Sequence, residues 1–189
     1  MIKIALFASG SGTNVENIAR YFSSHAAIEV AAVFSNNANA YVLERAKKLE
    51  LPSVVFNRSQ FYDSEWVLKQ LNDFEIDWIV LAGFLWLVPH QLIQAFPKRI
   101  INIHPALLPK FGGKGMYGDR VHQAVVANGE TETGITVHFV NDLYDQGAII
   151  EQKKVPVLPT DTPEMVAKKV HALEYEFFPS IIERTILSE

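Results

Sequence analysis

The sequence predicts an α/β fold: a Rossmann-like, mainly parallel twisted sheet with helices on both faces and an antiparallel edge. Strand-like apolar runs alternate with helical patterns along most of the 189 residues, as in such sheets. Two strand-like runs near the C-terminal end are too close for a crossover helix, which favours an antiparallel pair. No repeat, low-complexity tract or linker interrupts the pattern, so we expect residues 1–189 to form one domain.

The first half of the chain predicts four strands and four helices. Proline is favoured in the first helical turn, so Pro89 is expected to open the fourth helix. The expected strands cover residues 2–8, 29–34, 53–56 and 78–82, and the expected helices lie around residues 15–22, 41–49, 64–74 and 89–95.

The second half begins with a central strand and ends with a helix. Residues 105–118 are expected to form a loop, because six of the fourteen are proline or glycine. Thr162 and Pro163 are expected to start the last helix. The other expected elements are a strand at 100–103, a helix at 119–128 capped by Asp119 and ended by Gly129, and the paired strands 133–140 and 148–157.

Composition limits the classes of function. Hydrophobic residues make up 49% and charged residues 20% of the chain, and the formal net charge of −4 argues against a broad nucleic-acid-binding surface. The absence of cysteine excludes disulfides, thiolate metal sites and cysteine nucleophiles, and fits a reducing compartment.

The N-terminal apolar run superficially resembles a signal peptide. It is short, follows a single lysine and leads directly into a Gly/Ser/Asn turn, so a buried strand is the better interpretation. No run approaches the ~20 apolar residues of a membrane span. We therefore expect a cytoplasmic protein with no membrane or nucleic-acid partner.

Asn102-Ile103-His104-Pro105 is the most informative segment. Strand periodicity sends Asn102 and His104 to the same side, and Pro105 limits the strand. Polar side chains at the carboxyl end of a buried strand occupy the usual position for ligand contacts in open α/β sheets. The alternative is that Asn102 caps the strand and His104 is a satisfied core histidine.

Residues 9–14, Ser-Gly-Ser-Gly-Thr-Asn, lie between the first strand and the first helix. Glycines allow a sharp turn and close approach of a ligand, and helix N-terminal amides favour an anion. The segment lacks both the full Gly-x-Gly-x-x-Gly pattern and the P-loop pattern, so a single phosphate fits better than a dinucleotide or a nucleoside triphosphate. A plain capped turn is the alternative.

Residues 134–147 form a strand and a turn in which His138, Asp142 and Asp145 are candidates. An ordinary surface turn explains either aspartate, and His138 gains interest only if the turn folds back towards Asn102 and His104. The other histidines show no metal-ligand spacing, and no Gly-x-Ser-x-Gly nucleophile elbow is present, so metal and covalent serine catalysis are not expected.

Taken together, these segments resemble the phosphoribosylglycinamide formyltransferases, a branch of the formyltransferase superfamily. The resemblance runs in order along nearly the whole chain and implies a single-domain formyltransferase fold. Its segments are residues 10–14, 33–36, 81–84, 102–105 with 107–109, and 134–147.

The resemblance implies transfer of a formyl group from 10-formyltetrahydrofolate, a co-substrate, to the amine of glycinamide ribonucleotide in purine synthesis. No metal is implied, and the expected state is a monomer or a homodimer. Asn102, His104 and Asp145 would be catalytic. A carboxamide N–H and a protonated imidazole suit the negative charge that develops on the formyl oxygen, and a nearby Asp145 would favour the charged histidine.

The resemblance also implies binding residues. Gly12, Thr13 and Asn14 would receive the phosphate, and Glu174 would contact the glycinamide end. The residues implied for folate are Leu85, Trp86, Leu87, Val88, Asn102, Asn141, Asp142 and Tyr144.

Two departures from the family pattern concern the folate. Arginines that many members carry after the position of Phe61 and within 85–88 are missing, so the residues that hold the folate glutamate tail are left open, with Arg58 and Lys110 as candidate substitutes. The loop 110–121 is also longer than in many relatives, and its glycines suggest a mobile lid.

Three rival functions are compatible with parts of this pattern. A formyltetrahydrofolate hydrolase would not need the phosphate loop, and its relatives commonly carry an additional N-terminal domain. A methionyl-tRNA formyltransferase would need a tRNA-binding extension, which 189 residues of net acidic charge do not provide. A non-catalytic phosphate-ligand sensor is the third.

Overall fold

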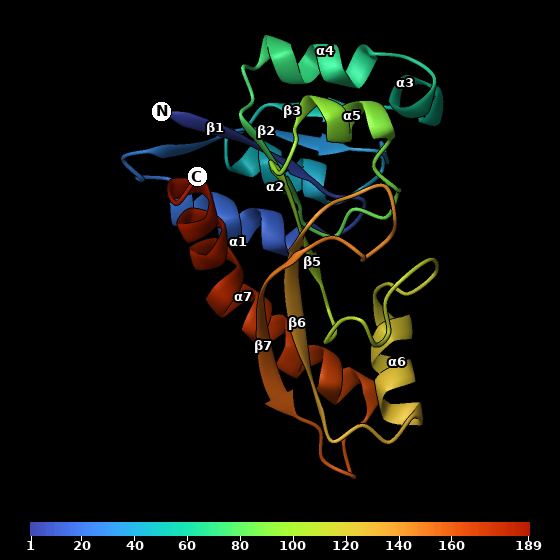
Figure 1. The fold of residues 1–189 in the computed structure, drawn as a ribbon. Coiled ribbons are helices and arrows are strands. Elements are labelled where there is room, and N and C mark those ends of the chain that lie inside the picture. The colour runs from blue at the N-terminus through green and yellow to red at the C-terminus, as the bar shows by residue number, and fades with distance from the viewer. The chain divides into compact units, whose positions relative to one another are not determined.

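The computed structural model describes all residues from Met1 to Glu189 (Figure 1). It divides into two compact units, Met1–Ile101 and Asn102–Glu189. The hydrogen-bonded strand order is β3-β2-β1-β4-β5-β6-β7. No helix has both the length and the apolar content needed to cross a bilayer.

The first unit is built on parallel strands. β1 pairs in parallel with both β2 and β4, and β2 pairs in parallel with β3, which confirms the predicted parallel sheet. Helices α1 and α2 lie on one side of these strands, and α4 and α5 on the other (Figure 1). The bounds are β1 Ile2–Phe7, α1 Thr13–Phe22, β2 Ile28–Ser35, α2 Val42–Lys48, β3 Ser53–Val55, α3 Arg58–Tyr62, α4 Trp66–Asp73, β4 Trp78–Leu81 and α5 His90–Ala95.

An aromatic cluster holds the carboxyl ends of these strands. The rings of Phe7 and Phe34, from β1 and β2, stack with centroids 4.9 Å apart. Phe84 meets Phe7 edge-on at 5.4 Å, and Phe56 stacks on Phe61 at 5.0 Å. This buried cluster fixes the segments that follow β3 and β4.

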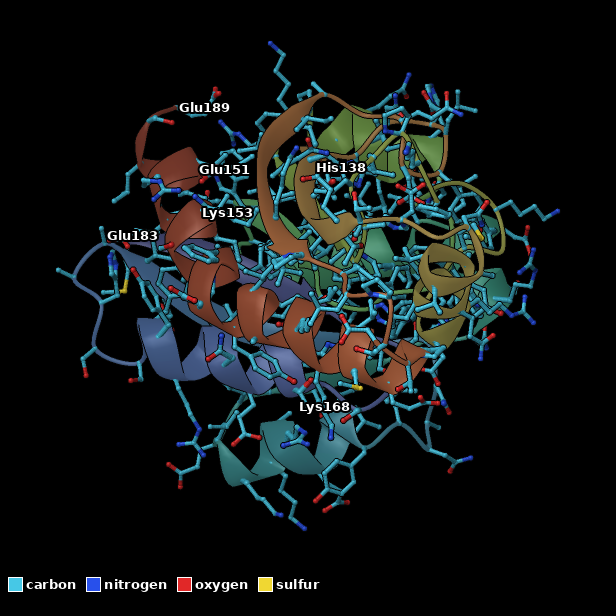
Figure 2. The ribbon with its side chains drawn as sticks, turned by 90° about the horizontal axis from the view of Figure 1, so that it is seen from below. His138, Glu151, Lys153, Lys168, Glu183 and Glu189 are labelled. Carbon is cyan, nitrogen blue, oxygen red and sulfur yellow. The ribbon has the colours of Figure 1, made fainter.

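The second unit pairs an antiparallel hairpin with helices. β6 and β7 are antiparallel, as predicted, and α7 packs against both strands and against α6. Charged contacts add to this packing: Glu151 on β7 pairs with Lys153 and with Arg184 of α7, each at 2.6 Å (Figure 2). The bounds are β5 Ile100–His104, α6 Asp119–Ala127, β6 Glu132–Phe139, β7 Ile149–Pro156 and α7 Pro163–Leu187.

Three local predictions need correction. Asp119 does not cap α6; Gly118 is the N-cap and Asp119 is the first helical residue, where its charge still suits the helix dipole. Pro89 is the N-cap of α5 rather than its first residue. Helix α3 was not predicted, although the capping box of Asn57 and Gln60 is a readable start signal.

Candidate functional site

Asn102 and His104 lie at the carboxyl end of β5, and Asp145 lies in the turn between β6 and β7. The structure brings all three into one cluster in the second unit. The His104 Nδ1 atom is 3.5 Å from Asp145 Oδ2. His104 is 3% exposed, so the pair has little access to water. The predicted return of the turn towards β5 is therefore present.

His138 joins the cluster and links Asn102 to Asp145. Its Nδ1–H donates to the Phe139 carbonyl at 2.8 Å, so the neutral ring has a bare Nε2. Asn102 Nδ2 donates to that Nε2 at 3.0 Å, and Asp145 Oδ1 lies 3.7 Å from it. His138 thus orients the Asn102 carboxamide. The sequence left its role open because the role depends on how the turn folds.

A β-bulge helps to place His138. The register between β6 and β7 shifts between Val137 and His138, so His138 pairs with Ile149. Bulges re-aim side chains and are common beside active sites. Gly147, on the returning chain, approaches so closely that a Cβ atom there would collide with the Phe139 carbonyl. This contact requires a glycine at position 147.

Backbone groups of the loop after β5 contact two of the three predicted catalytic side chains. His104 Nε2–H donates to the Phe111 carbonyl at 2.7 Å, and the Gly113 N–H donates to Asp145 Oδ2 at 2.9 Å. Phe111 and Asp145 both have left-handed backbones, at φ 56° and φ 55°. Such conformations are uncommon outside glycine and often occur at functional sites. No sequence pattern indicates these backbone contacts, because they depend on the path of the loop.

The same loop is tied to β6 by a buried threonine. The Leu108 N–H donates to Thr136 Oγ1 at 3.0 Å, and the Thr136 hydroxyl donates to the Ala106 carbonyl at 2.7 Å. Gln152 of β7 donates to the Leu108 carbonyl at 3.0 Å. These contacts hold the residues that follow His104 against the hairpin that carries His138.

Two opposing effects act on the charge of His104. Burial lowers the pKa of His104, and the Asp145 carboxylate only partly opposes this effect. Burial also disfavours the charged form of Asp145, but His138, His104 and the Gly113 N–H outweigh it and lower the pKa of Asp145. In the unliganded cluster, burial thus works against the imidazolium that the Asp145 carboxylate favours.

The predicted phosphate loop lies in the first unit. Gly12 is the N-cap of α1 and has φ 75°, so no side chain caps this helix end. A Cβ atom on Gly12 would collide with Val42, whose N–H donates to the Gly10 carbonyl at 3.0 Å. Thr13 and Asn14 form the partly buried first turn of α1. The loop thus presents a helix N-terminus, which suits an anion.

Residues 85–88 also lie in the first unit, and they differ in exposure. Leu85 is 45% exposed, whereas Val88 is buried. The Trp86 ring packs against the rings of Phe56, Phe61, Tyr62 and Phe84.

The other predicted binding residues lie in the second unit. Asn141 shapes the turn: its Oδ1 accepts from the Leu143 N–H at 3.0 Å, and its Nδ2 donates to the Gln146 carbonyl at 3.2 Å. Asp142 is exposed and Tyr144 is half-buried. Glu174 on α7 is buried, and His171 Nδ1 lies 3.0 Å from its Oε2. No group of three or more His, Cys, Asp or Glu side chains is arranged to hold a metal ion.

The family model described as formyl transferase matches residues 2–182 of this chain. The chain belongs to the formyl transferase family. The chain is 39% identical over 188 residues to a phosphoribosylglycinamide formyltransferase of Haemophilus influenzae, and the match covers 97% of the chain and 86% of that protein.

The chain is also 40% identical over 186 residues to the chloroplastic phosphoribosylglycinamide formyltransferase of Arabidopsis thaliana. That match covers 95% of the chain but 64% of the plant protein, and a Vigna unguiculata relative is covered over 60% of its length. The crystal structure of phosphoribosylglycinamide formyltransferase from Anaplasma phagocytophilum matches with a TM-score of 0.87 at 33% identity, covering 96% of this chain and 84% of that one.

Proposed function

We propose that this formyl transferase moves the formyl group of 10-formyltetrahydrofolate to the amine of glycinamide ribonucleotide in purine synthesis. The observation that carries the proposal is the cluster of Asn102, His104 and Asp145. This cluster lies in a chain that a phosphoribosylglycinamide formyltransferase matches over 97% of its length. The family match across both units also supports our proposal that residues 1–189 work as one formyltransferase domain.

The proposed mechanism begins with attack of the substrate amine on the formyl carbon. Negative charge then builds on the formyl oxygen, where N–H donors stabilise it. We assign this role to the Asn102 carboxamide, which has a second N–H besides the one given to His138, and to His104 Nε2–H. The formyl oxygen would take the place of the Phe111 carbonyl at His104.

Asp145 is proposed to support the proton steps. The attacking amine must lose a proton, and the departing folate nitrogen must gain one. When His104 takes up a proton at Nδ1, the Asp145 carboxylate at 3.5 Å is placed to stabilise the cation. Burial lowers the pKa of His104 in the free protein, so the cation would form only when Asp145 and the negative charge that builds on the formyl oxygen stabilise it.

The binding roles are also proposals. Gly12, Thr13 and Asn14 would bind the phosphate through the N-terminus of α1, and Glu174 would contact the glycinamide end. Leu85, Trp86, Leu87 and Val88 would contact the folate, together with Asn102, Asn141, Asp142 and Tyr144. These folate assignments rest on the family resemblance.

For the folate glutamate tail, Arg58 is the better supported of the two expected cations. Its guanidinium lies 4.7 Å from the Tyr62 ring centroid and 5.8 Å from that of Trp86, whereas Lys110 is paired with Glu130 at 3.0 Å. A cytoplasmic location and a monomeric or homodimeric state remain predictions. Two plant relatives are named as chloroplastic.

One assay separates the candidate functions. Deformylated folate is measured with purified protein and formyl-folate, in the presence and absence of glycinamide ribonucleotide. We expect release only when the amine is present, together with formylation of the amine. Release without the amine would indicate the hydrolase, and binding of the ribonucleotide without any release would indicate the sensor. Either result would overturn the proposal.

A further inference from the structure

Residues 83–88, which follow β4, lie where the chain changes direction across the sheet of the first unit. β1 lies between β2 and β4, so the chain adds β2 and β3 on one side of β1 and then crosses to add β4 on the other. In open α/β sheets, ligands bind beyond the carboxyl ends of the strands at such a reversal. Residues 83–88 belong to no helix or strand. Their path therefore depends on contacts with other segments.

Ser9 continues the link between β1 and β4 after the strands end. The last paired residues of the two strands are Phe7 and Leu81, and beyond them the Ser9 N–H donates to the Gly83 carbonyl at 3.0 Å. Gly83 has φ 81°, so the chain leaves the strand direction there. The buried Ser9 hydroxyl then accepts the Leu85 N–H at 3.0 Å. A side chain thus replaces the strand ladder as the partner of Leu85.

Tyr62 of α3 holds the same segment at a second point. Its hydroxyl donates to the Leu87 carbonyl at 2.9 Å, and the centroid of its ring lies 5.9 Å from that of Trp86. Leu85 and Leu87 are therefore each bound through one backbone group by a side chain that is distant in the sequence. A segment that is already fixed in this way loses less freedom when a ligand binds, which lowers the entropic cost of binding.

We propose that Ser9 and Tyr62 are positioning residues for the folate, because they fix the backbone of residues 85–87 in the conformation that binds it. The inference rests on the proposed function, since it takes residues 85–88 as part of the folate site. Ser9 and Tyr62 act through this segment, and the segment itself contacts the ligand. Without either hydroxyl, the folate would have to order the segment at the expense of affinity.

The test removes each hydroxyl separately. Ser9→Ala removes the acceptor of the Leu85 N–H but keeps the backbone N–H of residue 9, and Tyr62→Phe removes the hydroxyl but keeps the ring. Ser23→Ala and Tyr41→Phe are matched controls, because they remove hydroxyls from exposed residues of the same unit. The Kd of tetrahydrofolate is measured by calorimetry, KM is measured for each substrate, and thermal unfolding is measured for each variant.

We expect Ser9→Ala and Tyr62→Phe each to raise the Kd of tetrahydrofolate and KM for formyl-folate about three- to tenfold, the effect of losing one hydrogen bond. KM for glycinamide ribonucleotide should stay within about twofold, and the control variants should resemble the wild type. An unchanged Kd in the two folded variants, or an equal rise of KM for both substrates, would overturn the inference.

Amide hydrogen exchange gives a readout that does not depend on activity. The Leu85 N–H should exchange faster in Ser9→Ala than in the wild type or in Ser23→Ala, because it loses its acceptor. Unchanged exchange at Leu85 would overturn the role of Ser9.

The binding and turnover measurements separate failure of this inference from failure of the proposed function. If the wild-type protein binds tetrahydrofolate but formylates no ribonucleotide, the proposed function fails, and the Kd values of the variants still decide the inference. If the wild type transfers the formyl group and neither variant changes the Kd, the inference alone fails. A wild-type protein that binds no tetrahydrofolate would overturn both.

Discussion

At the scale of single residues, Asp145 lies beside two imidazoles. It is 3.5 Å from His104 Nδ1 and 3.7 Å from His138 Nε2, and the two rings make different hydrogen bonds. His138 is fixed as an acceptor by its own bond to the Phe139 carbonyl, and it orients Asn102. His104 has a free Nδ1 that faces the carboxylate. In the proposed mechanism, Asp145 stabilises a proton gained at this atom of His104.

Replacing Asp145 by asparagine tests that assignment. Asp145→Asn keeps the size of the side chain but cannot stabilise a cationic His104, so kcat should fall about a hundredfold or more. Steady-state kinetics measures the change, and Glu176→Gln, an exposed acid-to-amide change on α7, is the control. If the folded Asp145→Asn variant turned over at a rate close to that of the wild type, Asp145 would not be needed to stabilise a cationic His104.

The pKa of His104 is a second test. Burial should keep the pKa of His104 below 6.5 in the free protein, and Asp145→Asn should lower it further because the opposing charge is lost. Since the unfolded chain binds this proton more readily, His104 makes the protein less stable as pH falls through about 6.5. An NMR titration measures both pKa values. A higher pKa in the variant would be inconsistent with the electrostatics described.

At the scale of elements, chain reversals place the functional groups, and glycines allow these reversals. Gly147 lets β7 return past the Phe139 carbonyl, and Gly112 packs where a Cβ atom would meet Leu108 and Asp145. Gly12 starts α1 with a left-handed backbone against Val42. In each case the requirement comes from a neighbouring segment. Sequence patterns show that a glycine is present but not which contact requires it.

Gly12→Ala should affect both stability and substrate binding. The new Cβ atom enters a left-handed backbone and collides with Val42, so the free energy of unfolding should drop by at least about 1 kcal/mol. KM for glycinamide ribonucleotide should rise more than KM for formyl-folate. Denaturant unfolding and steady-state kinetics measure these changes.

Gly10→Ala is the matched control for that variant, because a Cβ atom at Gly10 meets nothing within 4 Å. Equal effects of the two substitutions on KM would argue against a phosphate site at the start of α1.

At the scale of the whole molecule, β5 belongs to both units. It begins at Ile100, in the first unit, and ends at His104, in the second, so one continuous strand carries the chain from one unit to the other. Melting of this strand would disturb both units. We therefore expect the two units to unfold together.

Two spectroscopic probes can test this cooperativity. All three tryptophans, Trp66, Trp78 and Trp86, lie in the first unit, so their fluorescence reports on that unit. Far-UV circular dichroism includes a large contribution from the 25-residue helix α7 of the second unit. We expect the two signals to change at the same denaturant concentration. Separate midpoints would mean that the units are independent domains.

The sequence predicted most of the strands because their apolar runs are long and bounded by turn residues. It placed Asn102 and His104 on one side because strand periodicity is local. The contact of Asp145 with His104 came from family resemblance, since no local rule brings a turn back to a distant strand. The effect of Asp145 on His104 followed from elementary electrostatics, whereas the opposing effect of burial could not be predicted, because burial is set by the whole surrounding structure rather than by one partner.

The hydrogen bond from His104 to the Phe111 carbonyl has a consequence for selectivity. In the proposed mechanism, the formyl oxygen takes the place of the Phe111 carbonyl oxygen as the acceptor of the His104 N–H. Both oxygens are uncharged at this stage. This exchange brings little net gain while the substrate is intact. The gain comes only when the migrating oxygen becomes an anion, which the peptide oxygen never does. The Phe111 carbonyl would thus compete with the intact substrate for the His104 N–H but not with the anion. This donor would therefore stabilise the activated complex more than the bound reactant.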